Sequence, residues 1–119
     1  MNMELIFSTK ERIKILKEVI FKTDSISVNK IAAKLKLSKG LISKYFDILT
    51  KGHILRKSKA GIFVSDRPIT KSIKILLNIT DININFFKKY PFVKSVGLYG
   101  SCAKGENTQE SDIDVWIRV

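Results

Sequence analysis

Two carboxylates near the C-terminus are the side chains best placed to do chemistry. Asp112 and Asp114 stand two positions apart in an apolar segment that continues to Val119. In a strand, residues two positions apart point the same way, so both carboxylates should project into one place. Adjacent carboxylates repel each other unless a hard cation lies between them. Mg²⁺ prefers oxygen ligands and keeps waters and substrate phosphates, so the pair predicts a magnesium site.

A Gly-Ser pair precedes the carboxylates, with ten residues between Ser101 and Asp112. Gly100 has no Cβ, so the backbone can approach a ligand closely there. Ser101 and the N–H groups of a helix starting at this point would offer donors and a positive dipole end to a phosphate. The spacing therefore predicts that Gly100 and Ser101 bind the phosphates of a nucleotide beside Asp112 and Asp114.

The runs 97–105 and 111–117 together resemble the signature of the polymerase-β-like nucleotidyltransferase superfamily, most closely its small minimal nucleotidyltransferase branch. Small residues stand where that branch often has them: Ala103, Gly105 and Ser111. The resemblance covers about residues 80–119. It implies that Asp112 and Asp114 are catalytic and hold two Mg²⁺ ions, about 3.5–4 Å apart in two-metal sites generally. It also implies a nucleoside triphosphate as substrate or ligand.

One departure from the family pattern leaves the question of enzyme activity open. In the superfamily, a third carboxylate from a later strand completes the metal site, whereas Val119 follows Asp114 by five residues. Glu106 and Glu110 lie in the loop before Asp112. The two-metal site is thus expected to be incomplete, in a fragment, a natural truncation or a degenerate domain kept for binding. A two-stranded sheet is marginal alone and its open edge invites pairing, which predicts a homodimer.

The elements that position these residues begin at residue 69. Helical spacing predicts a helix over 69–90, broken near 78–81 and ended by Pro91. The alternation over 82–86 also allows a strand there. Residues 92–99 and 112–119 are expected to be strands, with a turn and helix start at 100–105 between them. Three apolar side chains should face the core: Ile113, Val115 and Ile117. Trp116 either borders the site or packs in an interface, and packing is favoured.

Residues 8–66 indicate three helices followed by a hairpin. Three residues stand where helix N-caps are needed: Ser8 (in a capping box with Glu11), Ser27 and Ser38. Gly52 is expected to end the third helix as a C′ glycine. Strand-like runs at 53–57 and 61–65 flank a turn.

Helix, short helix, tight turn, helix and basic hairpin is the order of a winged helix-turn-helix. The segment 31–44 resembles the core of MarR- and ArsR-like regulators, whose third helix enters the DNA major groove while the wing lies along the backbone. This resemblance implies double-stranded DNA as a partner. Four residues should face the major groove: Ser38, Lys39, Ser43 and Lys44. Three should contact phosphates: Arg56, Lys57 and Lys59.

Charge supports the same division of labour. The net charge is +11. Residues 1–68 carry 15 Lys and Arg against 6 Asp and Glu, a net of +9, whereas residues 69–119 carry 7 against 5, a net of +2. A basic excess favours a polyanionic partner, although a Lys-rich solvated surface would also produce it.

Length and composition bound the remaining possibilities. The chain has 119 residues, of which 45% are hydrophobic and 28% charged, a globular profile. No apolar run reaches the roughly 18–20 residues of a membrane span, and the N-terminus lacks the features of a secretory signal, so a cytoplasmic protein is expected. One Cys and one His exclude a disulfide framework and argue against a His/Cys metal site.

The predicted fold class is α+β. Residues 1–67 should form a winged helix-turn-helix DNA-binding domain. Residues 68–119 should form the N-terminal part of a nucleotidyltransferase domain, a partial α/β unit with a short sheet. Three functions follow: a DNA-binding transcriptional regulator with a nucleotide- and Mg²⁺-binding module, an enzyme transferring a nucleoside monophosphate to a hydroxyl, or an antitoxin-like protein with a toxin partner.

Overall fold

The computed structural model describes residues 2–82 and 84–119. The chain forms two compact units, Met1–Thr70 and Lys71–Val119. Each described unit combines helices with one two-stranded antiparallel sheet, so the fold class is α+β, as predicted. Within the described ranges, the helices are too short or too polar to cross a membrane.

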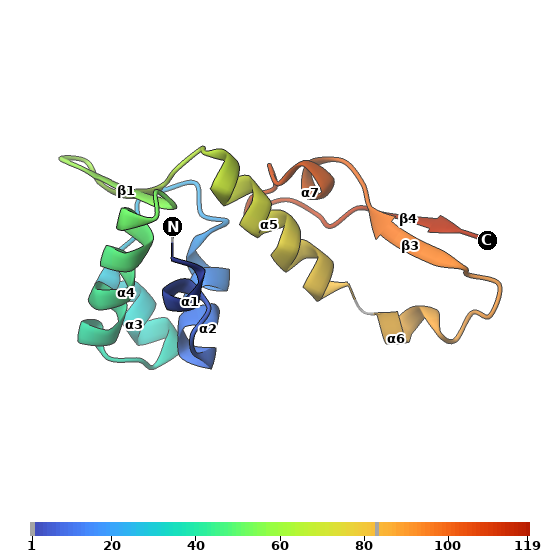
Figure 1. The fold of residues 1–119 in the computed structure, drawn as a ribbon, viewed down its shortest axis with the longest axis horizontal. Helices are drawn as coiled ribbons and strands as arrows, with labels where there is room; N and C mark the ends of the chain where they lie inside the picture. Colours follow the sequence, from blue (N-terminus) through green and yellow to red (C-terminus); the bar gives the residue numbers. More distant parts are fainter. Residues whose placement is uncertain (1, 83) are drawn as a thin grey trace. The chain divides into compact units, whose positions relative to one another are not determined.

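The first unit contains four helices and a hairpin (Figure 1). Its elements are α1 (Met3–Ile6), α2 (Lys10–Val19), α3 (Val28–Leu35), α4 (Lys39–Lys51), β1 (Leu55–Ser58) and β2 (Gly61–Val64). Ser27 and Ser38 cap α3 and α4, as predicted. The cap of α2 is Thr9, not Ser8, because Thr9 has the extended backbone that a cap requires and its hydroxyl accepts from the Arg12 N–H. The Ser8 hydroxyl instead accepts from the Arg12 guanidinium.

Helix α4 ends one residue later than the glycine pattern predicts. Gly52 is the C-cap with φ −82°, and the left-handed residue is His53, with φ 63°. The N–H of His53 donates to the carbonyl of Thr50, and the N–H of Ile54 donates to that of Leu49. These two bonds form a Schellman motif with a histidine at the C′ position. The motif turns the chain directly into β1.

A continuous apolar core holds the first unit together. Its largest fully buried side chains include Ile15, Leu16, Ile42, Phe46 and Tyr45. The Tyr45 hydroxyl donates to the Ile6 carbonyl at 2.8 Å, which fastens α1 to α4. Burial raises the pKa of the Tyr45 phenol well above its usual value, and the nearby Arg12 guanidinium partly opposes this.

The second unit is built on helix α5 and a two-stranded ribbon. Its elements are α5 (Pro68–Asp81, whose first residues belong to the first unit), α6 (Ile84–Phe87), β3 (Ser95–Leu98), α7 (Ser101–Lys104) and β4 (Val115–Arg118). The predicted break in the long helix follows Asp81, and α6 shows that residues 84–87 are helical rather than extended. Residue 83 of the ambiguous run lies outside the described residues.

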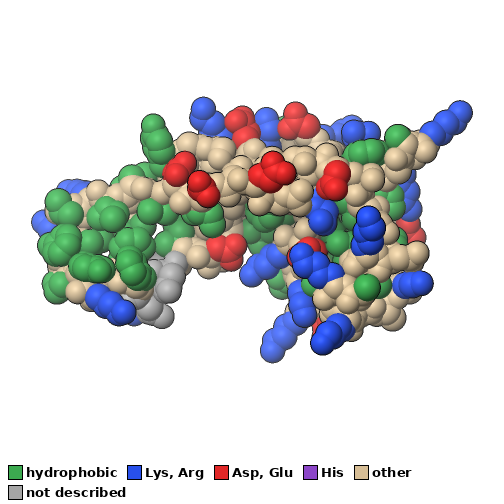
Figure 2. Space-filling view, turned by 180° about the vertical axis from the view of Figure 1, so that it is seen from behind, with side chains coloured by type: hydrophobic (Ala, Val, Ile, Leu, Met, Phe, Trp, Pro, Cys, Tyr) green, Lys and Arg blue, Asp and Glu red, His purple; other side chains and the backbone are tan. Residues whose placement is uncertain are grey.

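The last strand is shorter and more exposed than predicted. Strand β4 begins at Val115, so Asp112 and Asp114 precede it. Ile113, Val115 and Ile117 are exposed rather than buried. The cause is that the described β3–β4 sheet has only two strands, which leaves both of its faces open in large part. Figure 2 shows hydrophobic side chains gathered on the surface of this unit.

Candidate functional site

The β3–β4 ribbon brings Asp114 beside the Gly-Ser turn. Gly97 pairs with Trp116 in this ribbon, and the Tyr99 N–H donates to the Asp114 carbonyl at 2.9 Å, which extends the ladder by one pair. Gly100 follows Tyr99 with φ 64° and ψ −139°, a conformation that favours glycine. A Cβ at Gly100 would lie 3.6 Å from Asp114 Oδ2. Gly100 and Asp114, which the sequence predicts to share a site, therefore lie in near contact.

Asp112 is held to the same turn through its backbone. The Cys102 thiol donates to the Asp112 carbonyl at 3.6 Å, and Cys102 is completely buried. Because Cys102 directly follows Ser101, this contact places Asp112 close to the turn. Both carboxylates are exposed to solvent. Nothing in the sequence indicates that Cys102 anchors the backbone of Asp112.

The helix predicted after Gly100 exists but is a single turn. Helix α7 has four residues, and the N–H groups of Ala103 and Lys104 both donate to the Gly100 carbonyl. These two donors are used inside the turn, and so short a helix sums few peptide dipoles. The Ser101 side chain, half-buried at the first position of α7, carries a hydroxyl donor directly after Gly100.

Two asparagines that sequence analysis passed over hold this turn on α5. Asn78 and Asn107 are buried, with exposures of 2% and 5%. Asn78 Nδ2 donates to Asn107 Oδ1 at 2.8 Å and to the Cys102 carbonyl at 3.0 Å, and Asn107 Nδ2 donates to Asn78 Oδ1 at 3.0 Å. The sequence feature that indicates a buried role for Asn78 is its position as an amide inside the apolar run 75–79. Nothing in the sequence names its partner.

Gly105 completes the attachment of the turn to α5. Its φ is 68°, and an added Cβ would overlap the backbone of Lys71. The residue therefore needs glycine for two reasons, its left-handed backbone and the close approach of α5. Lys74 Nζ adds a bond to the Asn107 carbonyl at 3.1 Å.

The donor set suits Mg²⁺. Asp112 and Asp114 offer carboxylate oxygens only, in an open position that leaves room for waters and phosphates, which is how Mg²⁺ is usually bound. Residues 2–82 and 84–119 contain no group of three or more His, Cys, Asp or Glu side chains that could hold a metal. Glu106, in the loop before Asp112, has Lys71 Nζ at 4.0 Å from its carboxylate.

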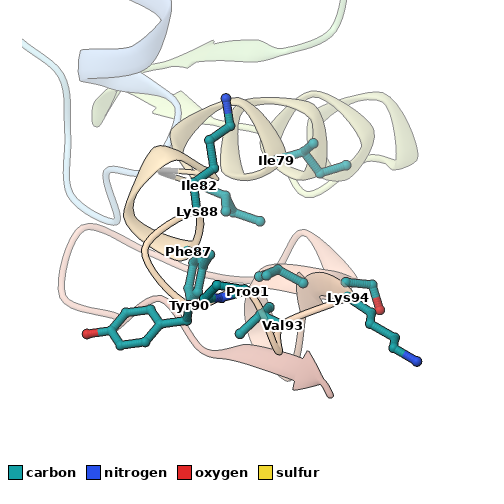
Figure 3. Close-up of a pocket in the computed structure, with 10 residues that line it drawn as sticks. Ile79, Ile82, Phe87, Lys88, Tyr90, Pro91, Val93 and Lys94 are labelled. Atoms are coloured by element: carbon teal, nitrogen blue, oxygen red, sulfur yellow. The ribbon is translucent and has the colours of Figure 1, made fainter.

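A separate hollow in the second unit does not contain these residues. A cavity of about 450 Å³ lies between the end of α5, α6 and β3 (Figure 3). Its lining is mainly apolar and includes Ile79, Phe87, Pro91, Val93 and Val96. The residues that line it do not include Gly100, Ser101, Asp112 or Asp114.

The residues predicted to read DNA are all in the first unit and exposed. Lys39, Ser43 and Lys44 lie on α4, and Ser38 is its cap, with a hydroxyl that accepts from the Leu41 N–H. Lys59 lies in the turn of the β1–β2 hairpin.

Two of the predicted phosphate contacts already have partners inside the protein. Lys57 Nζ lies 2.8 Å from Asp47 Oδ1, and the Arg56 guanidinium lies over the Phe63 ring at 4.8 Å. The hydrogen bond and charge of Lys57 lower the pKa of the Asp47 carboxyl, with a smaller contribution from Lys51. A phosphate would therefore compete with Asp47 for Lys57.

Comparison with known proteins agrees with the geometry of the second unit. The model of the family described as polymerase beta, nucleotidyltransferase matches residues 82–119. The matched segment includes Gly100, Ser101, Asp112 and Asp114. No curated protein and no solved structure shows a significant match to the chain. The segment 82–119 is thus similar to nucleotidyltransferases of the polymerase-β kind.

Proposed function

We propose that the Lys71–Val119 unit binds a nucleoside triphosphate together with Mg²⁺ through Gly100, Ser101, Asp112 and Asp114. The observation that carries this proposal is the near contact between Gly100 and the Asp114 carboxylate, in the segment that resembles nucleotidyltransferases. A glycine turn lets a phosphate approach the backbone closely, and a carboxylate holds the metal ion that is bound to the same phosphate.

Each residue has a distinct task in this proposal. Gly100 lets the phosphate chain approach the backbone, and the Ser101 hydroxyl donates a hydrogen bond to a phosphate oxygen. Asp112 and Asp114 hold the metal, with the Cys102 thiol fixing the backbone of Asp112. Bound Mg²⁺ would neutralise phosphate charge and orient the triphosphate.

For the first unit we propose DNA binding of the winged-helix kind, which would make the chain a nucleotide-responsive transcriptional regulator. Supporting features are the +9 charge of residues 1–68, a helix–turn–helix formed by α3 and α4, and exposed polar and basic side chains on α4. Helix α4 would lie in the major groove and the β1–β2 hairpin along the phosphates.

Nucleotidyl transfer is the second candidate, favoured by the family resemblance of residues 82–119. In that reaction an acceptor hydroxyl forms a bond to the α-phosphorus and gives up its proton to a base, while the bond to the leaving pyrophosphate breaks. An assay for pyrophosphate release separates the two candidates. Release that depends on Asp112 and Asp114 supports the enzyme, and nucleotide binding without release supports the regulator.

Calorimetric titration of Mg·ATP tests the proposed site. Wild type should bind, and the double variant Asp112→Asn/Asp114→Asn should bind at least tenfold more weakly, because neutral amides hold Mg²⁺ poorly. Glu110→Gln is the matched control, since Glu110 is an exposed carboxylate in the preceding loop. Equal affinities in wild type and the double variant would show that the carboxylates are not ligands.

The predicted homodimer, toxin partner and cytoplasmic location stay predictions. Light scattering after size exclusion, at several protein concentrations, tests the dimer. A mass of about 13.6 kDa at every concentration would contradict it.

A further inference from the structure

Trp116 occupies an unusual place on the face of the ribbon that carries Asp114. Asp114 precedes β4 and extends its ladder by one pair, so alternation puts Asp114 and Trp116 on one face, about 7 Å apart along the chain. Gly97 is the partner of Trp116 across the ribbon, and a Cβ added to Gly97 would overlap the indole ring. The indole therefore lies against the bare backbone of Gly97.

The ring is supported from below and open above. Trp116 is 47% exposed although it is the largest side chain of the unit. Tyr99, opposite Asp114 on the same face, is 67% exposed. Both rings therefore present an open aromatic surface beside the Asp114 carboxylate.

The order of groups along this face matches the order of groups in a nucleotide. The Gly100–Ser101 turn comes first, then the Tyr99–Asp114 pair, then Trp116 over Gly97. Phosphates bound at the turn and Asp114 would place a sugar over the next pair. The base would then reach the indole.

We propose that Trp116 is the stacking platform for the nucleobase of the bound nucleotide, with Gly97 present to let the indole lie flat. This inference rests on the nucleotide site proposed above and assigns its base-binding residue. Stacking on an aromatic face tolerates any base, because every base has a π-face. Stacking on Trp116 thus increases the affinity for a nucleotide without selecting one base over another.

Trp116 is the only tryptophan, so its fluorescence reports on this position alone. The experiment titrates wild type with Mg·ATP and with Mg·tripolyphosphate, which carries the phosphates without a base. Intrinsic fluorescence, acrylamide quenching and calorimetry are recorded for both ligands. We expect ATP to quench Trp116 and shield it from acrylamide, and tripolyphosphate to bind about tenfold more weakly without shielding.

Variants separate the platform from the phosphate site. Trp116→Leu should raise the Kd of ATP about tenfold and leave that of tripolyphosphate unchanged, whereas Trp116→Phe should lose less. Gly97→Val should act like Trp116→Leu by displacing the ring while keeping it for fluorescence. Phe92→Leu is the control, because Phe92 is an exposed aromatic outside the ribbon.

The outcomes distinguish this inference from the proposed function. Equal Kd values for ATP and tripolyphosphate in wild type, or an ATP affinity unchanged by Trp116→Leu, would overturn the platform and leave the phosphate site standing. Failure of both ligands to bind would overturn the nucleotide site and the platform with it. If ATP shields Trp116 of the wild type from acrylamide and tripolyphosphate does not, that result supports the platform without any variant.

Discussion

The buried pair Asn78 and Asn107 offers the sharpest test of how the second unit holds its site. Replacing Asn78 by Ala removes three hydrogen bonds, two to the Asn107 amide and one to the Cys102 carbonyl. Each is worth about 1 kcal/mol net, and a buried polar group left without a partner costs about 1–3 kcal/mol more. We therefore expect Asn78→Ala to lower the free energy of unfolding by about 4–6 kcal/mol.

A double-mutant cycle isolates the interaction between the two amides. Asn107→Ala removes the two shared bonds, leaves the bond from Asn78 to Cys102 and leaves the buried Asn78 Oδ1 without its partner, so it should cost about 3–5 kcal/mol. The double variant should cost about 2 kcal/mol less than the sum of the single variants, because the two shared bonds are then lost only once.

Urea unfolding followed by Trp116 fluorescence measures these changes, since the only tryptophan lies in the same unit. Gln109→Ala is the matched control, an exposed amide two residues from Asn107, and should change stability by less than about 0.5 kcal/mol. Additive single variants, or a cost below about 1 kcal/mol for Asn78→Ala, would refute the amide clamp.

Three further expectations follow from the structure. Gly105→Ala should destabilise the second unit by about 2–4 kcal/mol, because it adds left-handed backbone strain and overlaps with Lys71. Gly40→Ala, in open space on helix α4, should stabilise the first unit by about 0.5–1 kcal/mol. Urea midpoints from fluorescence and circular dichroism measure both changes, and equal effects of the two variants would contradict the overlap. Asp47→Asn should strengthen DNA binding at low salt, because it frees Lys57 from its ion pair. A plot of the logarithm of the DNA-binding constant against the logarithm of salt concentration should steepen by about one. An unchanged slope would exclude Lys57 from the interface. Because the pKa of Asp47 is lowered in the folded protein, its pairing with Lys57 stabilises the protein at pH values above the ordinary Asp pKa near 4. This stabilisation is lost as the pH falls through the pKa of the folded state. Lys57→Met should return the pKa of Asp47 toward its ordinary value in an NMR titration, and an unchanged pKa would exclude the pairing as the cause.

Sequence patterns located most helices and strands because local rules govern their ends. Ser27 and Ser38 cap helices where their hydroxyls can reach a free N–H three residues on. Two exceptions are one-residue choices: Thr9 rather than Ser8 at the start of α2, and His53 rather than Gly52 in the left-handed position. Residue type alone does not decide which of two neighbouring residues takes the cap or the left-handed position when both are suited to it. The strands predicted over 92–99 and 112–119 are also shorter, because β3 spans Ser95–Leu98 and β4 spans Val115–Arg118.

The exposed last strand could not be predicted for a different reason. Alternating apolar residues at Ile113, Val115 and Ile117 indicate a buried face, but burial depends on a layer that covers it. The described residues cover this face only in part, because Ile117 lines a hollow with Phe87 and Val93 yet remains 48% exposed. The same limit applies to Asn78, whose partner lies 29 residues away in a loop.

A crystal structure with Mn²⁺ and a non-hydrolysable ATP analogue tests the central claim most directly, because anomalous scattering locates the metal without reference to any variant. We expect a peak within about 2.0–2.3 Å of carboxylate oxygens of Asp112 and Asp114, with the triphosphate against Gly100 and Ser101. A triphosphate bound elsewhere, or a crystal grown at saturating ligand with no peak between the two carboxylates, would contradict it.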